Sequence, residues 1–79
     1  MKKNPEKTTS KLLDKFLELR KEQGLSHEKL AKMAGVHRST ISLVESKKIT
    51  PTILTCLKIS NALGVSLNEI LPSLGNDEE

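Results

Sequence analysis

Side chains that can hold an anion concentrate in one stretch of this chain, Ser26 to Lys48 (SHEKLAKMAGVHRSTISLVESKK). The stretch has five basic residues against two acidic ones, and its other polar side chains are hydroxyl groups and imidazoles. All of these groups except the carboxylates donate hydrogen bonds readily. The pattern is typical of a surface that binds a polyanion such as nucleic acid. A charge excess kept only for solubility is the alternative, and charge by itself favours neither.

Chemistry of other kinds has little support in the sequence. It contains no phosphate-cradling glycine loop, no paired carboxylates and no nucleophile beside a histidine, so we predict that the protein is not an enzyme. His27 and His37 lack a third ligand at a useful spacing, so we expect no metal and no cofactor. The single cysteine, Cys56, indicates a reducing cytoplasm, and it is either a buried small hydrophobe or a redox-sensing thiol.

The chain is one small domain of 79 residues with a net charge of +3. Such a chain buries only about 60% of its unfolded surface, which favours a compact helical bundle without a ligand cavity. No apolar run approaches the roughly 18 residues of a membrane-spanning helix. The start, MKKN, lacks the apolar part of a signal peptide. We therefore expect no membrane contact and no small-molecule ligand.

Two short amphipathic helices joined by a turn must position the polar side chains of this stretch. Ser26 is placed to cap the first helix, which ends after Ala34 at Gly35, a residue that readily adopts the left-handed conformation. The second helix begins at Arg38 and runs to about Ser46. At about 100° per residue its side chains divide into two faces. The inward face holds Ile41 and Val44, and the outward face holds Ser39, Ser42, Leu43 and Ser46, with Arg38 on its flank.

Three further helices are expected around this pair, without any strand or internal repeat. The first covers about residues 10–23, the next follows an N-cap at Thr52 and ends near residue 63, and the last opens with the capping box Ser66–Glu69 and stops at Pro72. Residues 1–9 are predicted to form a basic flexible arm, residues 10–72 the domain, and residues 73–79 an acidic disordered tail. The apolar faces are expected to come from Leu12, Phe16, Leu19, Ile53, Leu54, Leu57, Ile59 and Leu63, with Leu13 and Leu17 either widening the core stripe or meeting a second subunit.

Four positions, Ala31, Gly35, Ile41 and Val44, stand at the spacing of the helix-turn-helix of phage-repressor-like (Cro-type, xenobiotic-response-element) DNA-binding domains. The segments LRKEQGLS before them and TPTILTCLKISNALGVSLNEIL after them resemble the same family, so the similarity covers about residues 12–71. It implies an all-α, five-helix, lambda-repressor-like domain. The implied function is sequence-specific binding of double-stranded DNA by a transcriptional regulator, acting as a homodimer on a pseudo-palindromic operator.

The resemblance also implies roles for individual residues. Base-reading side chains are expected at Arg38, Ser39, Ser42 and Leu43. Contacts to the DNA backbone are expected at Ser26, His27, His37, Thr40, Ser46, Lys47 and Lys48. A structural ion pair is expected between Arg20 and Glu45, and the dimer interface on the last helix is expected at Leu67, Ile70, Leu71 and Leu74.

Several alternatives stay open. His27 and His37 stand at two positions where the family commonly has other residue types. Each of them either binds a phosphate or is a surface histidine without a special role. The arm either lies along DNA or has no role. Restriction-modification controller proteins, Cro-type repressors and some antitoxins all resemble the chain in length. The rival from another functional class is a protein-interaction module, in which the same fold docks a toxin or a transcription partner.

Overall fold

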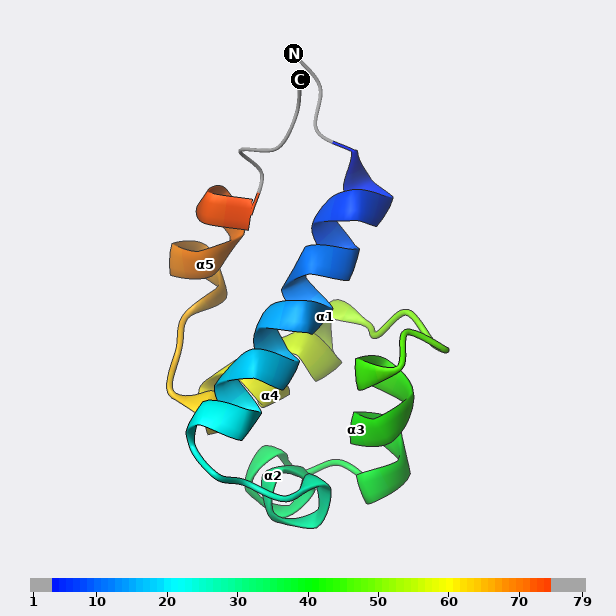
Figure 1. Ribbon diagram of the computed structural model, residues 1–79, viewed down its shortest axis with the longest axis vertical. Coiled ribbons are helices and arrows are strands. Elements are labelled where there is room, and N and C mark those ends of the chain that lie inside the picture. Colours follow the sequence, from blue (N-terminus) through cyan, green and yellow to red (C-terminus); the bar gives the residue numbers. More distant parts are fainter. Residues whose placement is uncertain (1–3, 75–79) are drawn as a thin grey trace.

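Five helices and their connecting turns make up residues 4–74, the part of the chain that the computed structural model describes (Figure 1). The helices are α1 (Pro5–Glu22), α2 (His27–Ala34), α3 (Arg38–Glu45), α4 (Ile53–Leu63) and α5 (Leu67–Leu74). No strand occurs within residues 4–74. The prediction of an all-α, five-helix domain is confirmed.

The first helix begins at Pro5, five residues before the predicted start. The Oδ1 atom of Asn4 accepts hydrogen bonds from the backbone N–H groups of Glu6 (3.0 Å) and Lys7 (3.1 Å). Proline at the first helical position costs no hydrogen bond, because that N–H has no partner inside the helix. The prediction of a flexible arm is therefore wrong for residues 5–9, and residues 1–3 lie outside the described part of the chain.

The last helix passes through Pro72 and ends at Leu74, so the prediction that Pro72 stops it is wrong. A proline lacks one donor, but its φ is compatible with a helix, and the Ser73 hydroxyl donates to the Ile70 carbonyl (2.8 Å) in this last turn. At the other end, Ser66 Oγ accepts from the Asn68 N–H (3.2 Å), one residue earlier than the predicted capping box requires. The rest of the predicted acidic tail, residues 75–79, lies outside the described residues.

The core is formed where α2 packs against α3 and α4, and where α1 packs against α3, α4 and α5. Figure 1 shows α1 crossing the middle of the molecule, with α5 on one side, α3 on the other and α4 behind it. The most deeply buried large side chains of the core are Phe16, Leu30, Ile41 and Ile59, each 1% exposed. Leu13 is also buried, so the wider core stripe on α1 is the correct alternative, and Leu17 is half-buried. No helix within residues 4–74 has the length and apolar character needed to cross a bilayer.

The fourth helix divides its apolar side chains differently from the prediction. Cys56, Ile59 and Leu63 are buried, whereas the predicted core residues Ile53, Leu54 and Leu57 are exposed. A wide apolar helix shows no polar face by which periodicity could select the buried side. The position of Cys56 in the core raises the pKa of its thiol through burial, which favours a packing role over a redox-sensing one.

Candidate nucleic-acid interface

The turn between α2 and α3 is set by local capping. Ser26 Oγ accepts from the Lys29 N–H (3.0 Å) and starts α2, as predicted. Gly35 has a φ of 73°, and the next N–H, from Val36, donates to the Ala31 carbonyl (3.0 Å). Only a residue without a side chain adopts this left-handed conformation at little cost. The turn that results directs α3 across α2 after three residues.

The inward and outward faces of α3 agree with the predicted division. Ile41 and Val44 are each 1% exposed and fix the helix to the core. The outward side chains leave a surface hollow of about 340 Å³ between the start of α2 and α3. It is lined by His27, Arg38, Ser39, Ser42 and Leu43. All four side chains predicted to read bases therefore share one concave surface with the first residue of α2.

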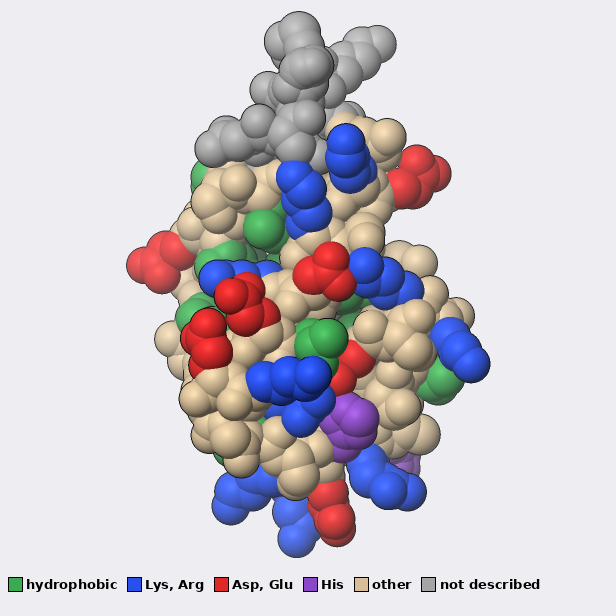
Figure 2. Space-filling view, in the orientation of Figure 1, with side chains coloured by type: hydrophobic (Ala, Val, Ile, Leu, Met, Phe, Trp, Pro, Cys, Tyr) green, Lys and Arg blue, Asp and Glu red, His purple; other side chains and the backbone are tan. Residues whose placement is uncertain are grey.

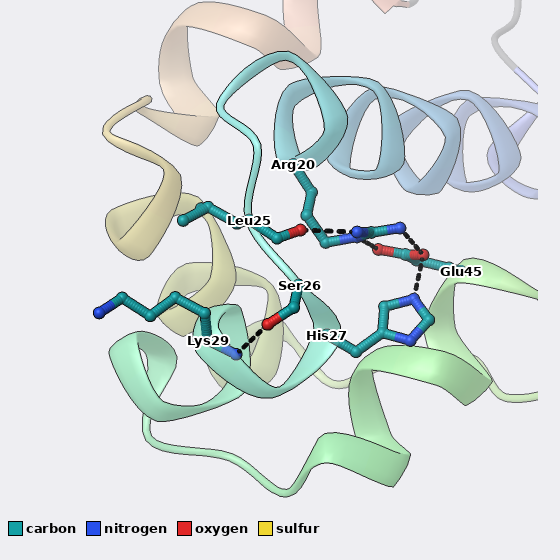
Figure 3. Close-up of polar contacts among 6 residues, drawn as sticks. All are labelled: Arg20, Leu25, Ser26, His27, Lys29 and Glu45. Carbon is teal, nitrogen blue, oxygen red and sulfur yellow. Dashed lines mark hydrogen bonds and ion pairs between the residues drawn. The ribbon is translucent and has the colours of Figure 1, made fainter.

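A carboxylate at the end of α3 ties this surface to α1 (Figure 3). Arg20 Nε donates to Glu45 Oε2 (2.5 Å), and Arg20 Nη2 donates to Glu45 Oε1 (3.1 Å). The third guanidinium nitrogen, Nη1, donates to the Leu25 carbonyl (2.7 Å), which fixes the link between α1 and α2. The side chains of Arg20 and Glu45 are only 13% and 9% exposed. The structure thus forms the ion pair that the resemblance implies.

The ring of His27 joins this cluster, which the sequence does not predict. Its Nε2 lies 2.9 Å from Glu45 Oε1, so the ring faces the carboxylate rather than standing free for a phosphate (Figure 3). Burial of Glu45 opposes its ionisation, but the hydrogen bonds and positive charges of Arg20 and His27 outweigh that effect and lower the pKa of Glu45. A carboxylate that stays ionised here keeps all three side chains in place.

The end of α3 is closed by two backbone hydrogen bonds. Lys47 has a φ of 63°, and its N–H donates to the Val44 carbonyl (3.0 Å) while the Lys48 N–H donates to the Leu43 carbonyl (2.9 Å). This pair of hydrogen bonds closes the helix in a Schellman motif, in which glycine usually takes the left-handed position.

The side chain of Lys47 contacts α1. Its Nζ lies 2.9 Å from Asp14 Oδ1 and donates to Ser10 Oγ (2.8 Å), both on α1. The role of Lys47 as a DNA-backbone residue stays a prediction. The sequence carries no local signal for the contact to α1, because the partners are more than thirty residues apart.

The other predicted backbone-binding residues lie at the two ends of α3 and in its first turn. His37 occupies the N-cap position of α3 without a side-chain capping bond, as expected for a histidine, and is exposed. Ser46 and Lys48 are exposed at the helix exit, and Thr40 is half-buried. Figure 2 shows basic side chains and a histidine gathered at the lower end of the view, which α2 and the start of α3 form.

The predicted dimer residues on α5 are mostly taken up by the core. Leu67 is only 8% exposed and packs inside, and Ile70 and Leu74 are half-buried against the core. Leu71 is 37% exposed and is the one large hydrophobic residue that α5 exposes in the described part of the chain.

Residues 4–74 also hold no group of three side chains suited to a metal ion.

The chain matches the helix-turn-helix family over residues 16–70. It is 40% identical over 52 residues to the HTH-type transcriptional regulator PuuR of Escherichia coli (strain K12), a match that covers 66% of this chain and 28% of PuuR. The chain thus spans little more than a quarter of that relative.

Two shorter relatives are covered more fully. The chain is 35% identical over 57 residues to the uncharacterized HTH-type transcriptional regulator YgzD of Bacillus subtilis (strain 168), covering 72% of this chain and 86% of YgzD. It is 36% identical over 55 residues to the control protein C.SmaI of Serratia marcescens, covering 70% of this chain and 66% of C.SmaI. The segment that matches the family, residues 16–70, contains α2, α3 and α4 and all the residues that line the hollow.

Proposed function

The chain belongs to the helix-turn-helix family of the Cro/C1 type, and on this premise we propose that it binds one specific sequence of duplex DNA as a two-fold dimer. Regulation of transcription through DNA binding is the function that the family match and the regulator relatives support. The sequence specificity, the dimer and the roles of single residues are the added proposal. The hollow between α2 and α3 is the observation that carries it.

The outward face of α3 suits the major groove, which is wide enough to admit an α-helix. The helix enters with its N-terminal end first, which brings Arg38 to the base edges. A guanidinium donates two parallel hydrogen bonds to O6 and N7 of guanine, and the leucine at position 43 packs on a thymine methyl group. Ser39 and Ser42 both donate and accept, so they discriminate weakly between bases.

Phosphates on either side of the groove are held by the two ends of the motif. At the first end, the N-terminus of α2 offers free N–H groups and a positive dipole beside Ser26 and His27. The Nε2 atom of His27 lies 2.9 Å from Glu45 Oε1, so the ring is directed at the carboxylate. We therefore assign the phosphate contact to the backbone of α2 and give the His27 ring the role of positioning α2. At the second end, Lys48 and Ser46 are exposed beside the exit of α3, and His37 and Thr40 complete the backbone set.

A two-fold dimer follows from the reach of a single motif. One recognition helix contacts only a few base pairs, and two half-sites about one helical turn apart give useful affinity and selectivity. A symmetric pair of copies requires a pseudo-palindromic operator, because each copy then meets the same sequence.

Selection of bound sequences from a random duplex pool, followed by titration of the selected duplex, tests the proposal. Log affinity should fall linearly with log salt, with a slope of about 0.9 per phosphate contact. One selected duplex should take up two copies of the chain. Binding that ignores salt, or saturation at one copy per operator, would contradict the proposal and favour the protein-interaction module.

Three variants separate base reading from backbone contact. Arg38→Ala should relax preference at one guanine by about 1–3 kcal/mol, and Leu43→Ala should remove preference at one thymine without altering the salt slope. Lys48→Ala should weaken binding to all sequences equally and lower the salt slope by about one. Lys21 is an exposed lysine on α1, so Lys21→Ala is the matched control. It should change neither the base preference nor the salt slope. Unchanged base preference in Leu43→Ala would mean that the proposed reading face is wrong.

A further inference from the structure

We propose that two copies of this chain associate through the outward side of α4, a surface formed by Ile53, Leu54 and Leu57 and called here the α4 face. The inference rests on the proposed function, because it names the place where the proposed dimer forms. It differs from the interface on α5 that the family resemblance implies.

The side chains of the α4 face are large, apolar and exposed to solvent. Ile53 is 73% exposed, Leu54 61% and Leu57 42%. At about 100° per residue these three positions fall within an arc of about 100°, so their side chains form one surface. The buried side of the same helix is complete without them, since Cys56, Ile59, Ser60 and Leu63 fill it. Ile53 and Leu54, the most exposed of the three, therefore contribute little to holding this domain together.

The charge of the chain favours a second copy as the occupant of this face. Each copy carries a net charge of +3, so a contact between two copies is favoured where the surface holds no charged side chain. Residues 49–57 contain no charged side chain, and Lys58 is the only one in α4. Lys58 lies one turn after Leu54 and is exposed, so two α4 faces brought together by a two-fold axis bury apolar surface while the long lysine side chains keep their ammonium groups in solvent. An acidic partner or a nucleic acid finds no cation within residues 49–57.

The location of the face also suits a dimer that holds DNA. Only residues 49–52 separate Lys48, the proposed phosphate contact at the exit of α3, from Ile53, the first residue of the α4 face. Contacts between two α4 faces would therefore set the distance between the two α3 helices. By contrast, α5 exposes one large hydrophobic side chain, Leu71, among its described residues. Of the two candidate surfaces, α4 offers the larger apolar one.

Sedimentation equilibrium of the full chain and of Ile53→Glu tests the inference. The position is 73% exposed, and a carboxylate at the first residue of a helix interacts favourably with its dipole, so the variant should fold. Two copies would bring two glutamates into one apolar contact. The dissociation constant of the dimer should therefore rise about 100-fold or more. The constant of the parent chain should change little with salt, because the contact is apolar.

Two matched controls place the same charge on other exposed hydrophobic positions. Met33→Glu lies on α2 (47% exposed), and Leu71→Glu lies on the α5 surface (37% exposed). Both should keep the dimer of the parent chain. Circular dichroism reports whether each variant is folded, and Leu54→Ser replaces Ile53→Glu if the latter is not. A parent chain that stays monomeric with and without DNA, an unaffected Ile53→Glu, or a dimer lost only in Leu71→Glu would each overturn the inference.

A parallel DNA titration separates this inference from the proposed function. A parent dimer that Ile53→Glu dissociates, but that binds neither a selected nor a random duplex, would support the α4 face and contradict the DNA-binding proposal. Operator binding by a dimer that Ile53→Glu leaves intact would support DNA binding and overturn the α4 face. If both hold, Ile53→Glu should occupy the operator at higher protein concentration and with a steeper dependence on it, because two monomers must then assemble on one duplex.

Discussion

Two ionic contacts join the end of α3 to α1, and they differ in burial. The inner contact, Arg20–Glu45, has side chains that are 13% and 9% exposed and is bidentate. The outer contact, Lys47–Asp14, has side chains that are 40% and 60% exposed and joins one ammonium to one carboxylate. Both contacts hold the same helix against the same neighbour, so they allow a comparison in which the environment is the main difference.

The comparison shows why charge pairs in one small domain differ in energy. In water, an ion pair gains little, because solvent screens it and two long side chains lose freedom. In a buried site, removal of one partner leaves a charge without solvent or counter-charge, which is far more costly. The position of α3, and hence of the hollow, should therefore depend on the inner contact and only weakly on the outer one.

The largest effect is expected from Arg20→Met, which leaves Glu45 buried without its main partner. We expect the free energy of unfolding to fall by about 3 kcal/mol, as measured by urea denaturation at neutral pH. Asp14→Ala, which breaks the outer contact, should cost about 0.5 kcal/mol. If Arg20→Met and Asp14→Ala lose equal amounts of unfolding free energy, burial does not determine how much each contact contributes to stability.

The double variant Arg20→Met, Glu45→Leu sharpens this comparison. Apolar groups in place of a buried ion pair are often neutral or stabilising, so the double variant should recover most of what Arg20→Met loses. His27 would then lose its carboxylate partner, and DNA affinity should fall even where stability returns. Recovery of both stability and affinity would mean that the cluster has no role in positioning α2.

A pH dependence of intermediate size is expected from Glu45. Because its pKa is lowered in the folded protein, it binds protons more weakly there than in the unfolded chain. Its contribution to stability is therefore complete above the ordinary value of 4.5 and is lost as the pH falls through the lowered pKa. The difference in unfolding free energy between the parent chain and Glu45→Gln should be constant near neutral pH and should shrink as the pH falls below 4.5. A constant difference over the whole range would contradict the origin assigned to the shift.

The two contacts also show which features can be predicted from a sequence. Helix caps and turns are local, so Ser26, Gly35 and Thr52 indicate their elements correctly. The inner contact is implied by the family resemblance. The outer contact joins Lys47 to Asp14, and no local pattern records a pairing over that separation. The side of α4 that faces solvent is equally hidden, since nearly all of its residues are apolar or small and only packing selects the buried ones.

The smallest effect is expected from Lys47, where backbone and side chain act in opposite directions. Lys47→Gly removes the outer contact, at a cost of about 0.5 kcal/mol, but it relieves a left-handed backbone that costs an L-residue about 1 kcal/mol. The two contributions nearly cancel, and the unfolding midpoint should move little. Lys47→Ala loses the contact while keeping the strained φ of 63°, so it should be less stable than Lys47→Gly by about 1 kcal/mol. If Lys47→Ala equals or exceeds Lys47→Gly in stability, the exit of α3 is not under backbone strain.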